Sequence, residues 1–505
     1  MDVVTPTRQI AVIGTGLSGE VAAFMLHHHS TGSVRVAAIF EADPTPGLHK
    51  HSLTIAGTRV DVPLRAFSPH YYPNLVQLYQ HLSLPTQAVD YSSCTSSVSP
   101  NEPLFRYRNI LIFGRAVPYL PVNDLISRKG LAKALAIVRD VLWMVFSGPH
   151  LLTSPKHKQR LAQETFSDFL RRQRFSEPFI YEFLYPILST ILSCTYRQVG
   201  DYPAIFILEF FCSRSTAILT GWYRVTRGVE EVSELLLKGF DTATLKLGVA
   251  VEYVRWDAVR QKVEVRDARG GRYYFDDVVM ATDATVARAL WRDPPAAVDR
   301  FLSLVPTHTA DITVHTDESF LPCVHSERRG MNVFCRKGAT GATGPSDDAS
   351  MTTALLSTYH PGLEGHARQL LETWNPLRPV AEGHTIRTIT MTRASWNMSS
   401  LAAYDAMVAD EALSSQHIHL AGAYSVPGLT LLEQAVVSGL RCAMQLGASP
   451  PFPVKERFET SLVLRLIGSA IVHWKELTAV SCLLVAMAAC HDRRQRHTFD
   501  LSTFS

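Results

Sequence analysis

The stretch Gln9–Glu41, QIAVIGTGLSGEVAAFMLHHHSTGSVRVAAIFE, decides the fold of this chain. Its apolar run Ile10–Ile13 is typical of a buried parallel strand, and it leads into a turn with glycines at positions 14, 16 and 19. A helical run follows, and a second apolar run, Val34–Phe40, ends on an acid. The order of strand, glycine turn, helix, strand and acid predicts a βαβ unit that binds a dinucleotide.

Each position of the glycine turn has a mechanical reason. We expect Gly14 to form the tight turn, Gly16 to let the backbone approach a pyrophosphate, and Gly19 to let the helix lie close to the strand. Leu17 and Ser18 begin the helix, whose free N–H groups and partial positive charge would face the phosphates.

The acid at the end of the second strand is Glu41, which lies 22 positions beyond Gly19. At this spacing a carboxylate can accept hydrogen bonds from a ribose hydroxyl. An acid there favours a ribose without a phosphate, and hence FAD or NAD over NADP. A βαβ unit that binds no nucleotide is the alternative.

Composition narrows the class of protein. The 505 residues predict two or three domains, and 46% hydrophobic with 19% charged residues is typical of a globular protein. The net charge of +3 and the lack of a basic stripe argue against nucleic acid as a partner. Eight cysteines without a CxxC pair favour neither disulfides nor zinc, so we expect a reducing, cytoplasmic location.

Two further stretches argue against a leader and a metal site. Met1–Thr7 has no apolar core, so we expect no signal peptide. The run His27–His29 could suggest a metal, but adjacent helical side chains diverge and cannot converge on one ion. We expect a solvated helix end there and no metal site.

The segment after Glu41 carries a family resemblance. It contains the loop His49–His51, then Val60-Asp61, Phe67 and Tyr72-Pro73-Asn74. This pattern resembles the flavin-containing amine oxidase superfamily, and within it a subgroup of FAD/NAD-binding oxidoreductases. The family usually has Gly-Gly where this chain has Gly47-Leu48.

The resemblance covers roughly residues 8–447 and implies an α/β fold. Its parts are an FAD-binding Rossmann-like (GR2-type) nucleotide domain and a discontinuous α+β substrate domain. We expect the FAD-binding domain to comprise residues 1–90, 221–300 and 410–450. The substrate domain would then comprise residues 91–220 and 301–409, and residues 451–505 would form an apolar and basic tail.

A second motif, near residue 430, resembles the closing flavin motif of the superfamily. It runs from His419–Tyr424 to the helical segment Gly428–Gly439. The resemblance implies that Gly422 and Ala423 approach the pyrophosphate, that Leu431 and Leu432 approach the flavin ring, and that the backbone of Val251 binds adenine. No cysteine lies between Gly422 and Gly428, so we expect the flavin to be bound without a covalent link.

Two polar side chains are the candidate catalytic residues, because the resemblance puts their loops beside the cofactor. Arg65 could steady an oxyanion or a carboxylate, and His49 could move a proton. A purely structural role is the alternative for both.

Three apolar segments leave their roles open. Gly130–Phe146 predicts a helix with Leu131, Leu135, Val138, Leu142 and Val145 on one side, and packing is favoured over contact with a membrane or a lipid-like substrate. Phe179–Ser193 predicts a helix that Pro186 starts or kinks. This helix would form either plain core or the wall of a cavity.

The third segment, Leu477–Cys490, is too short to span a bilayer, which takes about 20 residues, and a basic run follows it. Two roles of this tail stay open: it contacts a membrane peripherally, or it caps the domain interface.

The function that follows is an FAD-dependent oxidoreductase. We expect it to oxidise or desaturate a small hydrophobic molecule by hydride transfer to flavin N5. The alternatives are a double-bond isomerase of a lipid or polyketide, an amine oxidase, and a lipid-binding carrier without enzymatic activity. The intact glycine turn, Glu41 and the closing motif argue against the carrier. The oligomeric state stays open.

Overall fold

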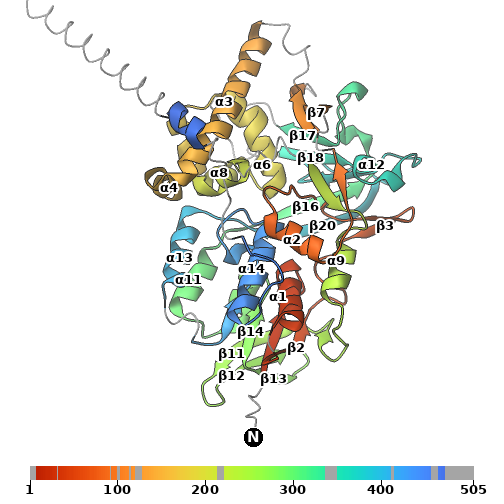
Figure 1. Ribbon diagram of the computed structural model, residues 1–505. Helices are drawn as coiled ribbons and strands as arrows, with labels where there is room; N and C mark the ends of the chain where they lie inside the picture. The colour runs from red at the N-terminus through yellow and green to blue at the C-terminus, as the bar shows by residue number, and fades with distance from the viewer. Residues whose placement is uncertain are drawn as a thin grey trace, which may run out of the picture.

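The computed structural model describes residues 7–30, 32–90, 92–98, 103–112, 115–119, 128–212, 221–335, 350–410, 415–455 and 465–472. The described chain forms two halves (Figure 1). The lower half in this view holds the N-terminal strand and helices α1 and α14, and the upper half holds α3, α6, α8 and the strands around β17.

A five-stranded parallel sheet forms the centre of the lower half. Its order is β10 (Leu245–Lys246), β2 (Val34–Phe40), β1 (Arg8–Ile13), β14 (Asp277–Met280) and β21 (Ile418–Leu420). The central strand β1 is apolar on both faces, and its residues 10–13 are at most 3% exposed. Its neighbours come from chain segments more than two hundred residues apart. The predicted α/β fold with a Rossmann-like sheet is therefore confirmed.

Helices α1 (Leu17–His28) and α14 (Leu432–Gln445) pack against each other beside this sheet. The packing requires a glycine at position 439, because a Cβ there would lie 2.5 Å from the carbonyl oxygen of Ser18. Helix α9 (Val229–Leu236) joins the same layer through Ser233, whose hydroxyl donates to Glu20 Oε1 at 2.6 Å. Two segments about four hundred positions apart thus meet at the glycine turn.

A smaller sheet and several short elements complete the lower half. The sheet has the order β13 (Arg272–Phe275), β12 (Lys262–Asp267), β11 (Val251–Asp257) and β15 (Trp291–Arg292), and β12 and β13 form a hairpin around Gly270-Gly271. The other helices of this half are α10 (Ala284–Leu290), α11 (Ala296–Leu304) and α13 (Met398–Val408). Helix α2 (Pro73–His81) packs on α14.

An eight-stranded mixed sheet lies in the upper half. Its order is β20 (Thr385–Ala394), β16 (Thr307–His315), β19 (Leu371–Trp374), β18 (Ser350–Leu355), β17 (Met331–Cys335), β6 (Ser93–Ser97), β7 (Pro103–Ile112) and β8 (Arg115–Tyr119). Strand β7 pairs along its first part with β6 and along its last part with β8. The sheet takes strands only from residues 93–119 and 307–394 of the described chain. The domain boundaries given above remain a prediction.

The remaining short elements connect these layers. Strands β3 (Leu53–Ile55) and β4 (Thr58–Val60) pair with each other, as do β5 (Thr86–Val89) and β9 (Trp222–Val225). The helical part of the upper half contains α3 (Arg128–Thr153), α4 (Pro155–Ala162), α5 (Phe166–Gln173), α6 (Tyr185–Leu192), α7 (Tyr196–Asp201) and α8 (Ala204–Cys212); the short α12 (Leu356–Tyr359) lies beside the large sheet.

The predicted packing face of helix α3 is wrong. Leu131, Leu135 and Leu142 are 42%, 60% and 49% exposed, whereas Met144 is buried. Asp140 explains the rotation of the helix, because its Oδ2 accepts hydrogen bonds from both the amide and the hydroxyl of Ser176, at 2.8 and 2.7 Å. The helix therefore packs through Asp140 and its neighbours and turns its leucines outward.

Pro186 lies in the first turn of α6, after a π-helical turn at Phe179–Leu184, so it starts this helix as predicted. Residues 465–472 form a helix against α3, where a Cβ at Gly468 would lie 2.2 Å from the carbonyl oxygen of Phe146. The segment Leu477–Cys490 and the basic run after it lie outside the described residues. Within the described part of the chain, every helix is too short or too polar to cross a membrane.

Candidate active site

The three glycines of the turn have two different structural roles. Gly14 has a φ of 98°, and a Cβ there would lie 2.7 Å from the carbonyl oxygen of Ala281. A Cβ at Gly19 would lie 2.0 Å from the carbonyl oxygen of Gly14. Around Gly16, in contrast, there is no atom within 4 Å of a Cβ position. Gly14 and Gly19 therefore shape the turn, and Gly16 leaves open space where helix α1 begins.

Glu41 ties the turn to the two segments beside it. Its Oε2 accepts hydrogen bonds from the amide of Thr15 at 2.8 Å and from the Thr15 hydroxyl at 2.5 Å. The amide of Gly47 donates to the same hydroxyl oxygen at 2.7 Å. Glu41 Oε1 accepts from the amide of Asp43 at 3.0 Å, and a carboxylate with three such bonds still has room for one more donor. The predicted contact of Glu41 with a ribose is compatible with this arrangement and stays a prediction.

The N-terminal end of α14 lies on the other side of the turn. Leu431 precedes the helix without a side-chain cap, so the first amides of α14 keep no side-chain partner at the cap position. Gly422, with a φ of 147°, donates its amide to the hydroxyl of Ser438 at 3.0 Å, which fixes the preceding loop on the helix. The partial positive charge of a helix start therefore lies at this position.

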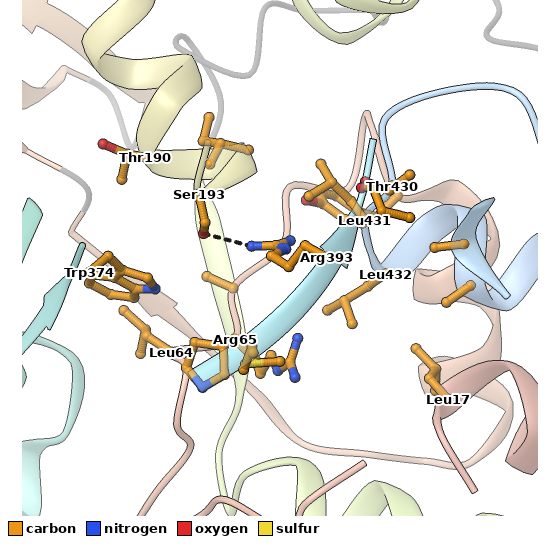
Figure 2. A pocket seen from close by; sticks show the side chains of 18 of the residues that line it. Leu17, Leu64, Arg65, Thr190, Ser193, Trp374, Arg393, Thr430, Leu431 and Leu432 are labelled. Atoms are coloured by element: carbon orange, nitrogen blue, oxygen red, sulfur yellow. Dashed lines mark hydrogen bonds between the residues drawn. The ribbon is translucent and has the colours of Figure 1, made fainter. Parts of the chain in front are cut away.

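A cavity of about 400 Å³ connects these parts with the upper half. At one end it is bordered by seven of the predicted cofactor residues, which are Gly16, Leu17, Ser18, Gly422, Ala423, Leu431 and Leu432. At the other end Trp374 and Leu64 face it (Figure 2). Much of its apolar wall comes from the π-helical turn before α6, from α6 itself and from the large sheet, which supply Phe183, Ile187, Ile191, Met331, Val333 and Met391. The segment Phe179–Ser193 thus lines a cavity, one of the two roles left open above.

Two arginines line the cavity between its two ends. Arg393, near the end of β20, donates from Nη1 to the hydroxyl of Ser193 at 2.8 Å (Figure 2). Arg65 follows Leu64, whose amide donates to Glu372 Oε1 at 2.8 Å. Burial raises the pKa of Glu372 to about 8. Glu372 therefore positions the backbone next to Arg65 but does not itself line the cavity.

Five of the predicted site residues do not line the cavity: Gly14, Gly19, Glu41, Val251 and His49. Val251 begins β11, two residues after Val249, whose amide donates to the carbonyl oxygen of Glu41 at 2.8 Å. Its contact with adenine stays a prediction.

His49, the second candidate catalytic residue, lies outside the set of described residues that line the cavity. His49 is half-buried outside the cavity wall, its charged neighbours include Glu230 and Arg59, and burial lowers its pKa. Its role in moving a proton stays a prediction.

Arg393, Ser193 and Trp374 are site residues that sequence reasoning missed. The motifs that carry the family resemblance include none of these three residues. Among the described residues there is no group of histidine, cysteine, aspartate and glutamate side chains that could hold a metal ion.

Comparison with known proteins decides the family. A model of the flavin-containing amine oxidoreductases matches residues 17–446. The chain belongs to this family. This flavin oxidoreductase is an enzyme whose cofactor is FAD. No curated protein is similar enough in sequence to count as a relative.

Solved structures of low sequence identity share the fold of this flavin oxidoreductase. Putrescine oxidase bound to putrescine has a TM-score of 0.59 at 16% identity, over 87% of this chain and 99% of that one. Cyclohexylamine oxidase from Brevibacterium oxydans IH-35A has a TM-score of 0.55 at 14% identity, over 88% and 99%. Reduced UDP-galactopyranose mutase has a TM-score of 0.55 at 13% identity, over 87% and 95%.

The residues present fit FAD. A Cβ at position 16 would fill the space above Gly16. The lack of a Cβ is what we expect where a pyrophosphate approaches the backbone. The start of α14 borders the same cavity and would supply partial positive charge to a flavin ring bound there.

Proposed function

We propose that this flavin oxidoreductase oxidises or desaturates a small apolar molecule, by hydride transfer to the flavin. The observation that supports this is the continuity of the cavity, which is lined by the glycine turn and α14 at one end and by apolar side chains at the other. A substrate in the apolar end would lie next to a ring held at the α14 end. Short distance and a dry site are what hydride transfer requires.

The chain contributes binding, exclusion of water and charge. When bound, FAD supplies the hydride acceptor at N5. Leu17, Leu431 and Leu432 would hold the ring, and Trp374 and Leu64 would cover the far end against water. The helix start at Leu432 would stabilise negative charge that develops on the ring.

Amine oxidation is the second candidate, because the family is named for it. Among the described residues that line the cavity there is no lysine. The apolar wall and the two arginines favour a substrate without a positive charge.

The test is an oxygen-free screen of apolar acids, alcohols, alkenes and amines against the purified yellow protein. Loss of the flavin absorbance on mixing, with an oxidised product after air is admitted, supports the proposal. Bleaching followed by recovery without any net oxidised product would instead indicate an isomerase. Bleaching only by amines would show that amine oxidation is the activity and would overturn the proposal.

A further inference from the structure

The two arginines of the cavity have few hydrogen-bond partners. Arg393 donates one hydrogen bond, to Ser193. The guanidinium of Arg65 donates none to another described residue, and Figure 2 shows it on the same side of the cavity as Leu432. Each guanidinium carries five N–H donors. Several donors of both side chains are therefore left to the space of the cavity.

The described wall of the cavity offers these two arginines no carboxylate partner. The only acid among the described lining residues is Asp283, which is next to Thr282 near the glycine turn and at the start of α10. Asp61 and Glu372 lie close enough to Arg65 to influence it but outside the cavity wall. Asp61 is also occupied, since it accepts hydrogen bonds from the amide of Val229 at 3.1 Å and from the Ser52 hydroxyl at 3.3 Å.

The surroundings of both arginines disfavour an isolated positive charge. Burial lowers the pKa of Arg65 and of Arg393, and the charge of Arg393 lowers the pKa of Arg65 further. Glu372, whose pKa burial raises to about 8, is mostly protonated at neutral pH and offsets little of this charge. A pair of desolvated cations is stable when an anion shares their donors.

We propose that the substrate carries an anionic group, a carboxylate or a phosphate, which binds between Arg65 and Arg393. Its apolar body would lie against Ile187, Met331 and Trp374. Guanidinium groups match the two oxygens of such a group, whereas a protonated amine would meet two like charges. This inference rests on the proposed function and names the substrate class of the same site.

The test measures binding to the FAD-loaded protein of four straight-chain compounds of equal length: a carboxylate, an alkyl phosphate, an alcohol and an amine. The shift of the flavin absorbance and the tryptophan fluorescence report binding without turnover. We expect the carboxylate or the phosphate to bind at least about tenfold more tightly than the alcohol, and the amine to bind least tightly. The better of the two anions identifies the group.

Variants assign the effect to the two arginines. Arg393→Met and Arg65→Met should each weaken anion binding about 10- to 100-fold and leave alcohol binding unchanged. Arg288→Met is the matched control, because Arg288 is exposed and paired with Asp299 at 2.8 Å, and it should change neither. If Arg393→Met does not fold, Arg393→Lys keeps the charge but loses the paired donors, and it should weaken anion binding by a smaller factor.

The possible failures are distinguishable. Tighter binding of the amine, or anion binding that neither arginine variant weakens, would overturn the inference. If the variants lose FAD and keep anion affinity, the arginines serve the cofactor, and the inference is wrong while the proposed function stands. If acids bind but never bleach the flavin, while neutral apolar compounds do bleach it, the inference about the anionic substrate is wrong and the proposed function stands.

Discussion

Gly16→Ala should separate the stability of the fold from the binding of FAD. Gly16 has a φ of −67° and a ψ of 166°, which alanine adopts without strain, and there is no atom within 4 Å of the added Cβ. The free energy of unfolding without cofactor should therefore change by less than about 1 kcal/mol. The methyl group would occupy the space of the pyrophosphate and displace charge-assisted hydrogen bonds. We expect FAD to bind about 10- to 100-fold more weakly.

Two further variants serve as comparisons for the effects of Gly16→Ala on stability and on FAD binding. Gly19→Ala places a Cβ 2.0 Å from the Gly14 carbonyl oxygen, so it should destabilise the fold itself by about 1–3 kcal/mol or more. Gly32→Ala adds a methyl group in open space away from the cavity and should change neither quantity. The assays are urea unfolding of the cofactor-free protein and titration with FAD followed by quenching of flavin fluorescence. Unchanged FAD affinity in Gly16→Ala would refute the placement of the pyrophosphate.

Four other substitutions test the bonds of Glu41, the burial of Glu372 and the rotation of helix α3. Glu41→Ala leaves the amide and hydroxyl of Thr15 without their acceptor and should cost about 2–4 kcal/mol in urea unfolding; a loss below 1 kcal/mol would contradict the buried network. Because burial raises the pKa of Glu372 from 4.5 to about 8, its stabilising contribution is complete below about pH 4.5 and is lost as the pH rises to 8. Glu372→Gln should flatten this decline. The slope of the free energy of unfolding against pH, measured across that range, should change by at most about 1.4 kcal/mol per pH unit. Leu135→Ser on the exposed face of α3 should change stability by less than about 0.5 kcal/mol, whereas Met144→Ala should cost about 2–5 kcal/mol; equal losses would show that the helix is rotated differently.

The parts of the fold that sequence could predict are those with local rules. The glycine turn, its flanking strands and the start of α6 at Pro186 follow from steric properties of single residues, and the structure contains all three. The meeting of α14 with the turn is not local. The resemblance predicted it, and the physical reason appears only in the structure, where Gly439 lies against the Ser18 carbonyl.

The errors arise where tertiary contacts outweigh the local pattern. The leucines of α3 form an apolar stripe, yet Asp140 and its bonds to Ser176 set the rotation of that helix. Arg393 was missed because an arginine in a strand points to one face or the other, and only the assembled sheet shows that this face borders a cavity.

The most direct test of the central claim is the amount of FAD bound per chain in protein substituted on opposite sides of the cavity. Gly16→Ala changes the turn, and Ala435→Leu projects from α14 into the same space. If both segments enclose one cofactor, the purified wild-type protein holds one FAD per chain and each variant loses most of it while its unfolding without FAD stays cooperative. Full FAD content in either folded variant would contradict the claim.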